Sequence, residues 1–315
     1  MTPRELAIVR SVMYASLFDY PLRIDELHRS LVGCAATPQE IFVTFERSHA
    51  LQRLVEYHDG FFFPAGRRDL IRERRQRERR SRAFLTAHRF VLRLICAIPF
   101  TRLVALSGSI AHLNLEPSGD LDLFIVTRGP RVWTVTVAVL LLTKLLRRRR
   151  VVCANFIVSD THLVLDQQDL FTANQVIHLR PLIGRALVDE LCRANPFITE
   201  LYPNARQRLP PVDVWPAVAW RSPGLDRIKR ALEWILQTPS PAIERLCRAA
   251  YGWHLRRRAT RWPSPEQVRL QADYLKLHTH SHRRSILDRY EEAMAVALAG
   301  ADRDGVTPVI RAAAR

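Results

Sequence analysis

Residues 104–127 read VALSGSIAHLNLEPSGDLDLFIVT, and two aspartates one residue apart begin its apolar end. We expect Asp120 and Asp122 to open a strand, because the residues that follow are typical of a buried one. Side chains at positions i and i+2 of a strand point to the same face, so the two carboxylates should project side by side. Neighbouring carboxylates repel each other unless a cation binds between them. The stretch therefore predicts a cation site.

The upstream half of the stretch supplies groups that a phosphate chain needs. Gly108 lets the backbone approach a ligand closely, and Ser109 adds a hydroxyl beside backbone amides. Carboxylates suit Mg²⁺, which also takes oxygens from substrate phosphates. The combination predicts metal-assisted nucleotidyl transfer, in which metal ions stabilise the attacking and leaving oxygens. The alternative is a strand end whose acids lie in solvent or pair with arginines such as Arg128.

Gly108-Ser109, a linker, and Asp120-Leu-Asp122 in an apolar strand resemble the signature of the polymerase-beta-like nucleotidyltransferase superfamily, over residues 104–160. The resemblance implies a nucleotidyltransferase fold with a short mixed sheet. It also implies Mg²⁺-dependent transfer of a nucleoside monophosphate from a triphosphate, with ATP expected, to a hydroxyl on a protein, an RNA or a small molecule, with release of pyrophosphate. Gly108 and Ser109 would bind the phosphates, and Asp120 and Asp122 the metal ions.

The resemblance also implies a third carboxylate, a general base on a neighbouring strand. The expected strand, VVCANFIV, contains no acid and offers Asn155, whose amide cannot take a proton at neutral pH. Asp160 at its end could substitute, as could Asp166 or Asp169. An acid within about 5 Å of the two aspartates would favour an enzyme. Asn155 alone would favour a catalytically weak regulatory module that binds nucleotide or nucleic acid. Leu113 also departs from the family, in which several members have glycine.

Further polar residues surround the expected site. His112 in the linker could contact a phosphate or lie in solvent. Residues 171–185 are expected to form a helix that packs on the sheet and could turn side chains toward the base or the acceptor. The polar residues of that helix are Asn174, Gln175, His178 and Arg180. The candidate catalytic residues are Asp120, Asp122 and Asp160, and the candidate nucleotide-binding residues are Gly108, Ser109, His112 and Asn155.

Three alternating histidines, His278, His280 and His282, could bind zinc or copper if they lay on a strand. No acidic residue lies within this segment, and the neighbouring sequence favours a helix. A basic surface turn is the alternative interpretation, and we favour it.

The chain has 315 residues, of which 48% are hydrophobic, and a formal net charge of +17. The length suggests about two domains. The charge favours anionic partners such as nucleotides, nucleic acid or acidic proteins. Nearly all the basic residues are arginines, since the only lysines are Lys144, Lys229 and Lys276. Biased codon usage could therefore explain the charge as well as phosphate recognition does.

The five cysteines are scattered and form no CxxC pair. This favours a reducing, cytoplasmic compartment, without a disulfide framework or a structural zinc site. The most apolar segment, residues 132–146, contains Lys144 and is shorter than the roughly 20 residues that cross a bilayer. We expect a buried helix there and no membrane partner.

The pattern predicts an α+β protein in four parts. In residues 1–66, three helices precede a hairpin at Asp59-Gly60, and the third helix begins with the capping box Thr37-Pro38-Gln-Glu40. This order resembles a winged helix, which either binds DNA or makes protein contacts. Residues 67–100 form a basic connecting helix, which either holds a nucleic-acid backbone or is solvated and paired, as in Glu73 with Arg77. The transferase core spans residues 101–209, and a helical C-terminal region spans residues 210–315.

Overall fold

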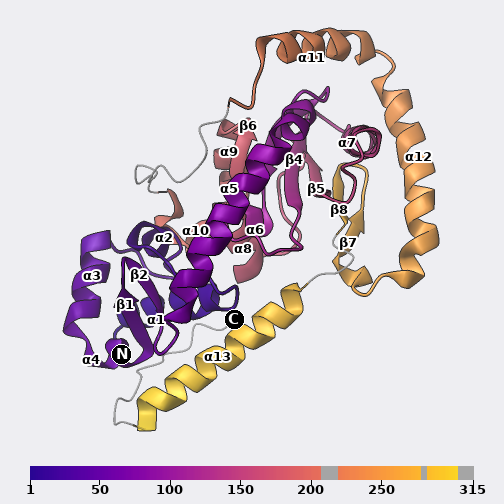
Figure 1. The fold of residues 1–315 in the computed structure, drawn as a ribbon. Coiled ribbons are helices and arrows are strands. Elements are labelled where there is room, and N and C mark those ends of the chain that lie inside the picture. The colour runs from indigo at the N-terminus through magenta and orange to yellow at the C-terminus, as the bar shows by residue number, and fades with distance from the viewer. Residues whose placement is uncertain (207–218, 278–281, 304–315) are drawn as a thin grey trace.

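A mixed sheet lies at the centre of the fold in the computed structural model, which describes residues 1–206, 219–277 and 282–303 (Figure 1). Its six strands stand in the order β6-β3-β4-β5-β8-β7. The strands are β3 (Thr101–Leu106), β4 (Leu121–Thr127), β5 (Val152–Ser159), β6 (Arg180–Ile183), β7 (Val268–Leu270) and β8 (Tyr274–Leu277). Only β4 and β5 are paired in parallel, and the other pairs are antiparallel. The protein is therefore a mixed α+β protein, as the sequence predicts.

Helices cover both faces of this sheet. On one face, Val104 and Ile125 pack in a cluster with residues of α5 (Asp69–Cys96) and α7 (Val132–Leu145). On the other, Ala105 and Phe124 pack in a second cluster, with residues of α8 (Leu170–Ile177), α9 (Ala186–Ala194) and α10 (Phe197–Leu201). This alternation follows from the two-residue repeat of a strand buried on both sides. The helix α6 (Gly108–Ala111) and the short 3₁₀ helix η1 (Pro203–Arg206) complete this part.

The N-terminal segment has the predicted order of helices followed by a hairpin. Its elements are α1 (Pro3–Ser16), α2 (Ile24–Arg29), α3 (Pro38–Arg47), α4 (His49–Leu54), β1 (Val55–His58) and β2 (Phe61–Pro64). The capping box of Thr37 and Glu40 at the start of α3 is confirmed, and Asp59 and Gly60 turn the hairpin with φ of +55° and +85°. The short α4 was not expected. We call residues 1–66 the N-terminal module, and its relation to winged helices stays a prediction.

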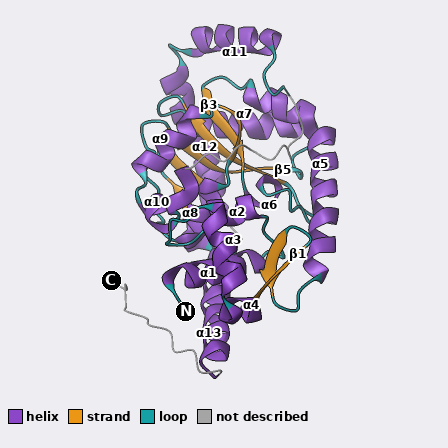
Figure 2. Cartoon of the chain, turned by 90° about the vertical axis from the view of Figure 1, so that its left-hand side faces the viewer, coloured by secondary structure: helices purple, strands orange, loops and turns teal. Residues whose placement is uncertain are grey.

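The basic connecting segment is one long helix, α5, which runs from the N-terminal hairpin along the side of the sheet (Figure 2). Two of its arginines, Arg74 and Arg77, are buried. Arg74 bonds the carboxylate of Glu26 at 2.6 Å, and Arg77 bonds Glu73 at 2.7 Å. The predicted pairing along this helix is therefore present, and these two arginines face protein carboxylates rather than solvent.

The region after residue 209 corrects the expectation of helices alone. It contains α11 (Pro223–Leu236), α12 (Ser240–Arg258), α13 (Arg283–Arg303) and the 3₁₀ helices η2 (Ala259–Arg261) and η3 (Pro265–Gln267). It also supplies β7 and β8, and β8 pairs with β5 of the expected core. In addition, α13 packs Met294 and Ala297 into the core of the N-terminal module. The boundary at residue 209 therefore divides one sheet, because strand pairing joins segments that are distant in sequence.

The apolar segment expected to form a buried helix is α7. Trp133, Val135 and Val139 are buried, whereas Leu145 near its end is 81% exposed. Across the described part of the chain, no helix is both long enough and apolar enough to cross a membrane.

Candidate metal and nucleotide site

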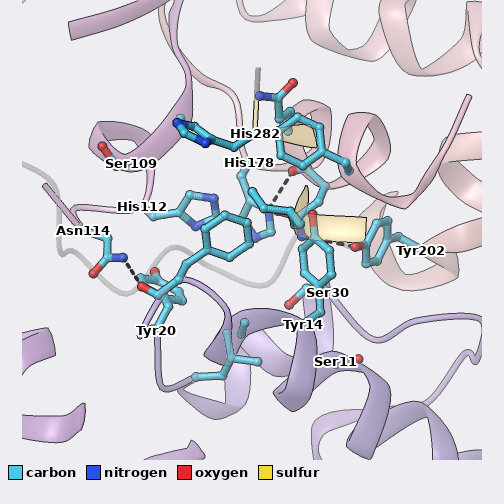
Figure 3. Close-up of a pocket in the computed structure, with 18 of the residues that line it drawn as sticks. Ser11, Tyr14, Tyr20, Ser30, Ser109, His112, Asn114, His178, Tyr202 and His282 are labelled. Atoms are coloured by element: carbon cyan, nitrogen blue, oxygen red, sulfur yellow. Dashed lines mark hydrogen bonds between the residues drawn. The ribbon is translucent and has the colours of Figure 1, made fainter. Parts of the chain in front are cut away.

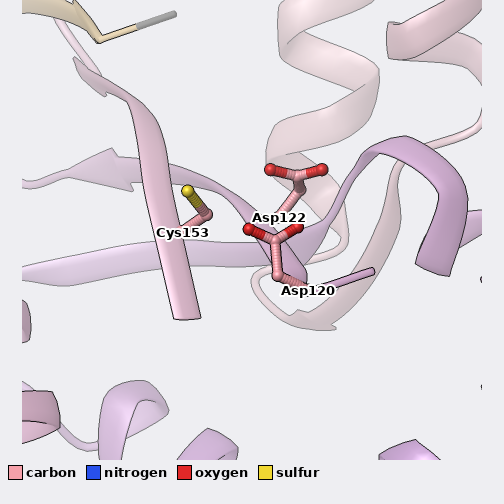
Figure 4. A group of neighbouring side chains, drawn as sticks. All are labelled: Asp120, Asp122 and Cys153. Atoms are coloured by element: carbon pink, nitrogen blue, oxygen red, sulfur yellow. The ribbon is translucent and has the colours of Figure 1, made fainter. Parts of the chain in front are cut away.

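Asp120 and Asp122 meet Cys153 at the start of two neighbouring strands (Figure 4). One ligand atom from each of the three side chains lies within 4.8 Å of the others, and all three residues are partly buried. The parallel register of β4 and β5 places Asp122 opposite Cys153, which explains their proximity. Leu121 and Leu123, which alternate with the two aspartates, are buried, and the expectation that the carboxylates project side by side is confirmed.

The two carboxylates are electrostatically strained. Burial, together with the neighbouring charge of Asp120, raises the pKa of Asp122 to about 7. The side-chain amide of Asn155 opposes this rise, since its Nδ2 donates to Asp122 Oδ1 at 3.5 Å. Burial and the two aspartates also raise the pKa of the Cys153 thiol to about 12. A bound cation would relieve the repulsion between the acids.

Gly108 lies directly against Asp122. A Cβ built on Gly108 would lie 2.5 Å from Asp122 Oδ2, and the φ of Gly108 is +61°, in the region that favours glycine. The backbone N–H of Ser107 donates to the carbonyl of Asp122 at 2.9 Å and fixes the turn to the strand. The structure therefore brings Gly108 and Ser109 together with the aspartates, as the sequence predicts.

The first half of the linker between the two halves of the motif, residues 110–115, is largely buried and is attached to the N-terminal module, whereas residues 116–118 are exposed. Leu113 and Leu115 pack in the core, and Leu113 has a φ of +53°. This conformation favours glycine, which is the residue that several members of the resembled superfamily have at this position. Asn114 donates from Nδ2 to the carbonyl of Phe18 at 2.8 Å.

Asp160 does not reach the aspartate pair. Because β4 and β5 are parallel, their first residues lie together at one end of the strands. Ser159 pairs with Thr127 at the opposite end. Asp160 therefore lies about 20 Å along the strands from the pair, at a rise of about 3.3 Å per residue. There its carboxylate accepts from Gly129 N and bonds Arg102, both at 2.7 Å. The proposal of Asp160 as a catalytic residue is corrected.

The other two acids considered also bond elsewhere. Asp166 pairs with Arg269 at 3.0 Å, and Asp169 caps α8 through Thr172 N and pairs with Arg283. Among the described residues, only Cys153 joins the two aspartates in a group that could hold a metal ion. The neighbouring strand thus offers the Cys153 thiol and the Asn155 amide in place of a third carboxylate.

A cavity of about 350 Å³ opens beside Asp122 (Figure 3). Three parts of the chain line it: the N-terminal module, the sheet with α8, and the start of α13. Ser109, Asn155, Asn174, Gln175 and His178 are among its lining residues, so these candidates are brought together. Arg180, expected on the same helix, instead begins β6 and does not line the cavity.

His112 lines the cavity between two other rings. Its ring centroid lies 4.3 Å from that of His178 and 5.1 Å from that of Tyr20. Burial, with the positive charges of Arg180 and Arg74, lowers the pKa of His112 to about 3, so the imidazole is neutral at neutral pH. The interpretation of His112 as a solvated loop residue is therefore wrong, and its contact with a phosphate stays a prediction.

Of the three alternating histidines, His278 and His280 lie outside the described residues. His282 is exposed and lines the cavity from the segment that leads into α13. The surface turn that we favour for the three histidines therefore stays a prediction, and the zinc site stays its alternative.

Sequence reasoning missed two parts of the site. Cys153 could have been found, because a parallel β4–β5 pair places the first residues of both strands together. The wall formed by Tyr14, Phe18 and Tyr20 carries no motif, and only the packing of the N-terminal module against the core reveals it. A comparison of the chain with protein-family models, curated proteins and solved structures finds no match. The function is therefore argued from the geometry of the site.

Proposed function

We propose that the protein binds a nucleoside triphosphate with Mg²⁺ and transfers its nucleotidyl group to an acceptor hydroxyl. One observation carries the proposal: Gly108 lies directly against the carboxylate of Asp122, which lines a cavity of about 350 Å³ and lies beside Asp120. This is the spatial arrangement that a glycine–serine turn and a pair of metal-binding aspartates need to act on one triphosphate. The resemblance to polymerase-beta-like nucleotidyltransferases supports the same reaction.

The donor atoms of Asp120 and Asp122 fit Mg²⁺, which prefers carboxylate oxygens and takes further ligands from water and phosphate. The Cys153 sulfur does not fit it, because thiolate ligands suit softer metals and the pKa of this thiol is about 12. We therefore assign the metal to the two carboxylates. When bound, Mg²⁺ would neutralise charge on the phosphates and on the leaving pyrophosphate.

The remaining side chains would position the substrate. Ser109 lines the cavity, and its hydroxyl can donate to a phosphate oxygen, while the absence of a side chain on Gly108 lets the backbone lie directly against the Asp122 carboxylate. The neutral His112 can donate or accept one hydrogen bond without adding charge. The acceptor, whether protein, RNA or small molecule, would bring its hydroxyl to the same end of the cavity.

Nucleotide binding without efficient transfer is the second candidate, and a specific observation favours it. In the described residues, the strand beside the aspartates offers Asn155 and Cys153 where the resembled enzymes have a carboxylate base. An amide cannot accept the acceptor's proton, and a general base typically contributes about 10²–10⁴-fold to a rate. This candidate describes a regulatory module that binds a nucleotide or a nucleic-acid end.

Measuring pyrophosphate release separates these functions. The protein would be incubated with Mg²⁺ and each α-labelled nucleoside triphosphate, alone and with total RNA or protein extract as acceptor. Transfer predicts pyrophosphate release and labelled acceptor, both abolished in an Asp120→Asn, Asp122→Asn double variant and retained in Asp160→Asn. Release that is equal in the wild type and the double variant would overturn the enzyme proposal. Bound nucleotide without release would support the second candidate.

A further inference from the structure

The part of the cavity remote from the aspartates is neutral. The chain contains 48 lysines and arginines, yet none is among the described residues that line the cavity. Asp122 is its one acidic lining residue among them, and burial holds His112 neutral. Among the described lining residues, a phosphate chain would find no lysine or arginine, and a cationic acceptor would find only the carboxylate of Asp122. The interior therefore suits an uncharged group.

Aromatic rings make up much of this neutral wall (Figure 3). The N-terminal module contributes Tyr14, Phe18 and Tyr20, and the core contributes Phe171 and Tyr202. The rings of Tyr14 and Phe18 lie 5.6 Å apart at an interplanar angle of 60°. Aromatic side chains stack on the faces of flat heterocycles, whichever substituents the heterocycle carries. The wall thus favours a planar ligand.

Amide side chains provide hydrogen-bonding groups in the same cavity. Asn174 and Gln175 of α8 line the cavity, and Asn174 donates from Nδ2 to the Tyr202 hydroxyl at 3.2 Å. Asn114 is 5% exposed, and its Oδ1 has no hydrogen-bond partner among the described residues although its Nδ2 bonds Phe18. An amide offers both a donor and an acceptor, which is the pattern that the edges of nucleobases present.

The aromatic wall is a fixed part of the site. Asn204 donates to the carbonyls of His28 and Ala36 at 3.0 Å each, and Gly33 N donates to the carbonyl of Leu201 at 2.8 Å. Asn204 is fully buried. These bonds join the N-terminal module to the core next to the cavity, so the module is a structural part of the site.

We infer that the cavity is a nucleoside-binding site whose recognition wall is built by the N-terminal module. The base lies among the rings of Tyr14 and Phe18 and the amides of α8, and the ribose points toward Asp122. The orientation rests on the proposed function, which places phosphates at Gly108. The nucleoside group belongs either to the triphosphate donor or to the end of a nucleic-acid acceptor. The donor and the acceptor would present the same base and ribose to the cavity.

Binding of free nucleosides to the full-length protein tests this inference. Adenosine, guanosine, cytidine and uridine would each be titrated calorimetrically without metal. We expect at least one to bind, and Phe18→Leu and Gln175→Ala each to weaken it about tenfold, as loss of one stacking ring or one amide pair does. Phe90→Leu and Gln76→Ala, at exposed positions of α5, are the matched controls and should bind like the wild type. Melting temperatures would verify that each variant is folded.

Failure of this inference is distinguishable from failure of the proposed function. Absence of binding by all four nucleosides, or equal binding by the cavity variants and their controls, would overturn the inference even if transfer occurs. Nucleoside binding that persists in the Asp120→Asn, Asp122→Asn variant would support it even if no transfer is found. Competition by a triphosphate or by a short RNA would then identify the source of the nucleoside group.

Discussion

Gly108 and Asp122 are in such close contact that a Cβ on Gly108 would lie 2.5 Å from the Asp122 carboxylate. This contact joins the two halves of a motif that are separated in sequence by the linker of residues 110–119. It explains why the chain has glycine here in two independent ways, since φ is +61° and the space for a side chain is occupied by a carboxylate.

Gly108→Ala should therefore impair both the fold and the site. We expect a loss of about 1–3 kcal/mol in the free energy of unfolding from the strained backbone and a displaced Asp122 carboxylate. Metal and nucleotide binding should fall with it. Gly60→Ala is the matched control, because Gly60 also has a positive φ, of +85°, but nothing within 4 Å of its Cβ position. If both variants lost nucleotide affinity equally, the contact with Asp122 would not be responsible.

Asp122→Asn should stabilise the metal-free protein. The pKa of Asp122 is raised to about 7 in the fold, so the carboxylate costs stability as the pH rises from about 4 toward 7. An amide removes this cost, and we expect a gain on the order of 4 kcal/mol at pH 7.5 in EDTA that shrinks toward pH 4. Thermal denaturation measures it. The control Asp160→Asn should instead lose stability, because it weakens the bonds to Gly129 N and Arg102. If Asp122→Asn were less stable than the wild type, the Asp122 carboxylate would not be destabilising in the metal-free fold.

Cys153→Asp should restore a third carboxylate beside the pair. If the lack of a carboxylate base limits the reaction, Mg²⁺-dependent pyrophosphate release by the Cys153→Asp variant should rise about tenfold or more. The metal-free protein should become less stable, because a third buried charge is added. Cys153→Ser is the control, since it keeps the size of the side chain without the charge. A Cys153→Asp protein that binds Mg²⁺ more tightly but shows no greater release would assign the chain to binding rather than transfer.

The partly buried Glu26 should make the stability of the protein sensitive to acid. Burial alone would raise its pKa, but Arg74 and Arg23 overcome this and lower it to about 2. Because the pKa of Glu26 is lower in the folded than in the unfolded protein, its ion pairs with Arg74 and Arg23 stabilise the fold above the unfolded pKa. This stabilisation is lost as the pH falls from about 4.5 toward 2. The contribution is on the order of 2–3 kcal/mol. Denaturant titrations across this range should show a smaller pH dependence for Glu26→Gln than for the wild type.

The local parts of the fold could be predicted from the sequence. The capping box at Thr37, the turn at Asp59 and Gly60, and the strand that follows Asp120 all depend on residues close together in the chain. The aspartate pair and its contact with Gly108 follow from the spacing of one motif. These elements agree because local propensity and burial favour the same structure there.

Non-local pairing determined the rest. Strand β8 (Tyr274–Leu277) has four residues, and its place is set by antiparallel pairing with β5 rather than by its own pattern. Asp160 follows the strand that the sequence predicts beside the aspartates, which is why the sequence suggests it as a site residue. In the parallel β4–β5 pair, however, the last residues of β5 lie at the end of the strands opposite to Asp120 and Asp122. The rings of Tyr14 and Phe18 reached the site through packing between segments about 100 residues apart in the chain, which no periodicity encodes.

Calorimetric titration of each nucleoside triphosphate with Mg²⁺ into the wild type and the Asp120→Asn, Asp122→Asn variant measures whether the two aspartates form a metal–triphosphate site. We expect at least one triphosphate to bind the wild type, EDTA to abolish most of this affinity, and the double variant to lose it in Mg²⁺. Equal affinity in both proteins, or wild-type binding that EDTA leaves unchanged, would contradict a metal–triphosphate site at these aspartates.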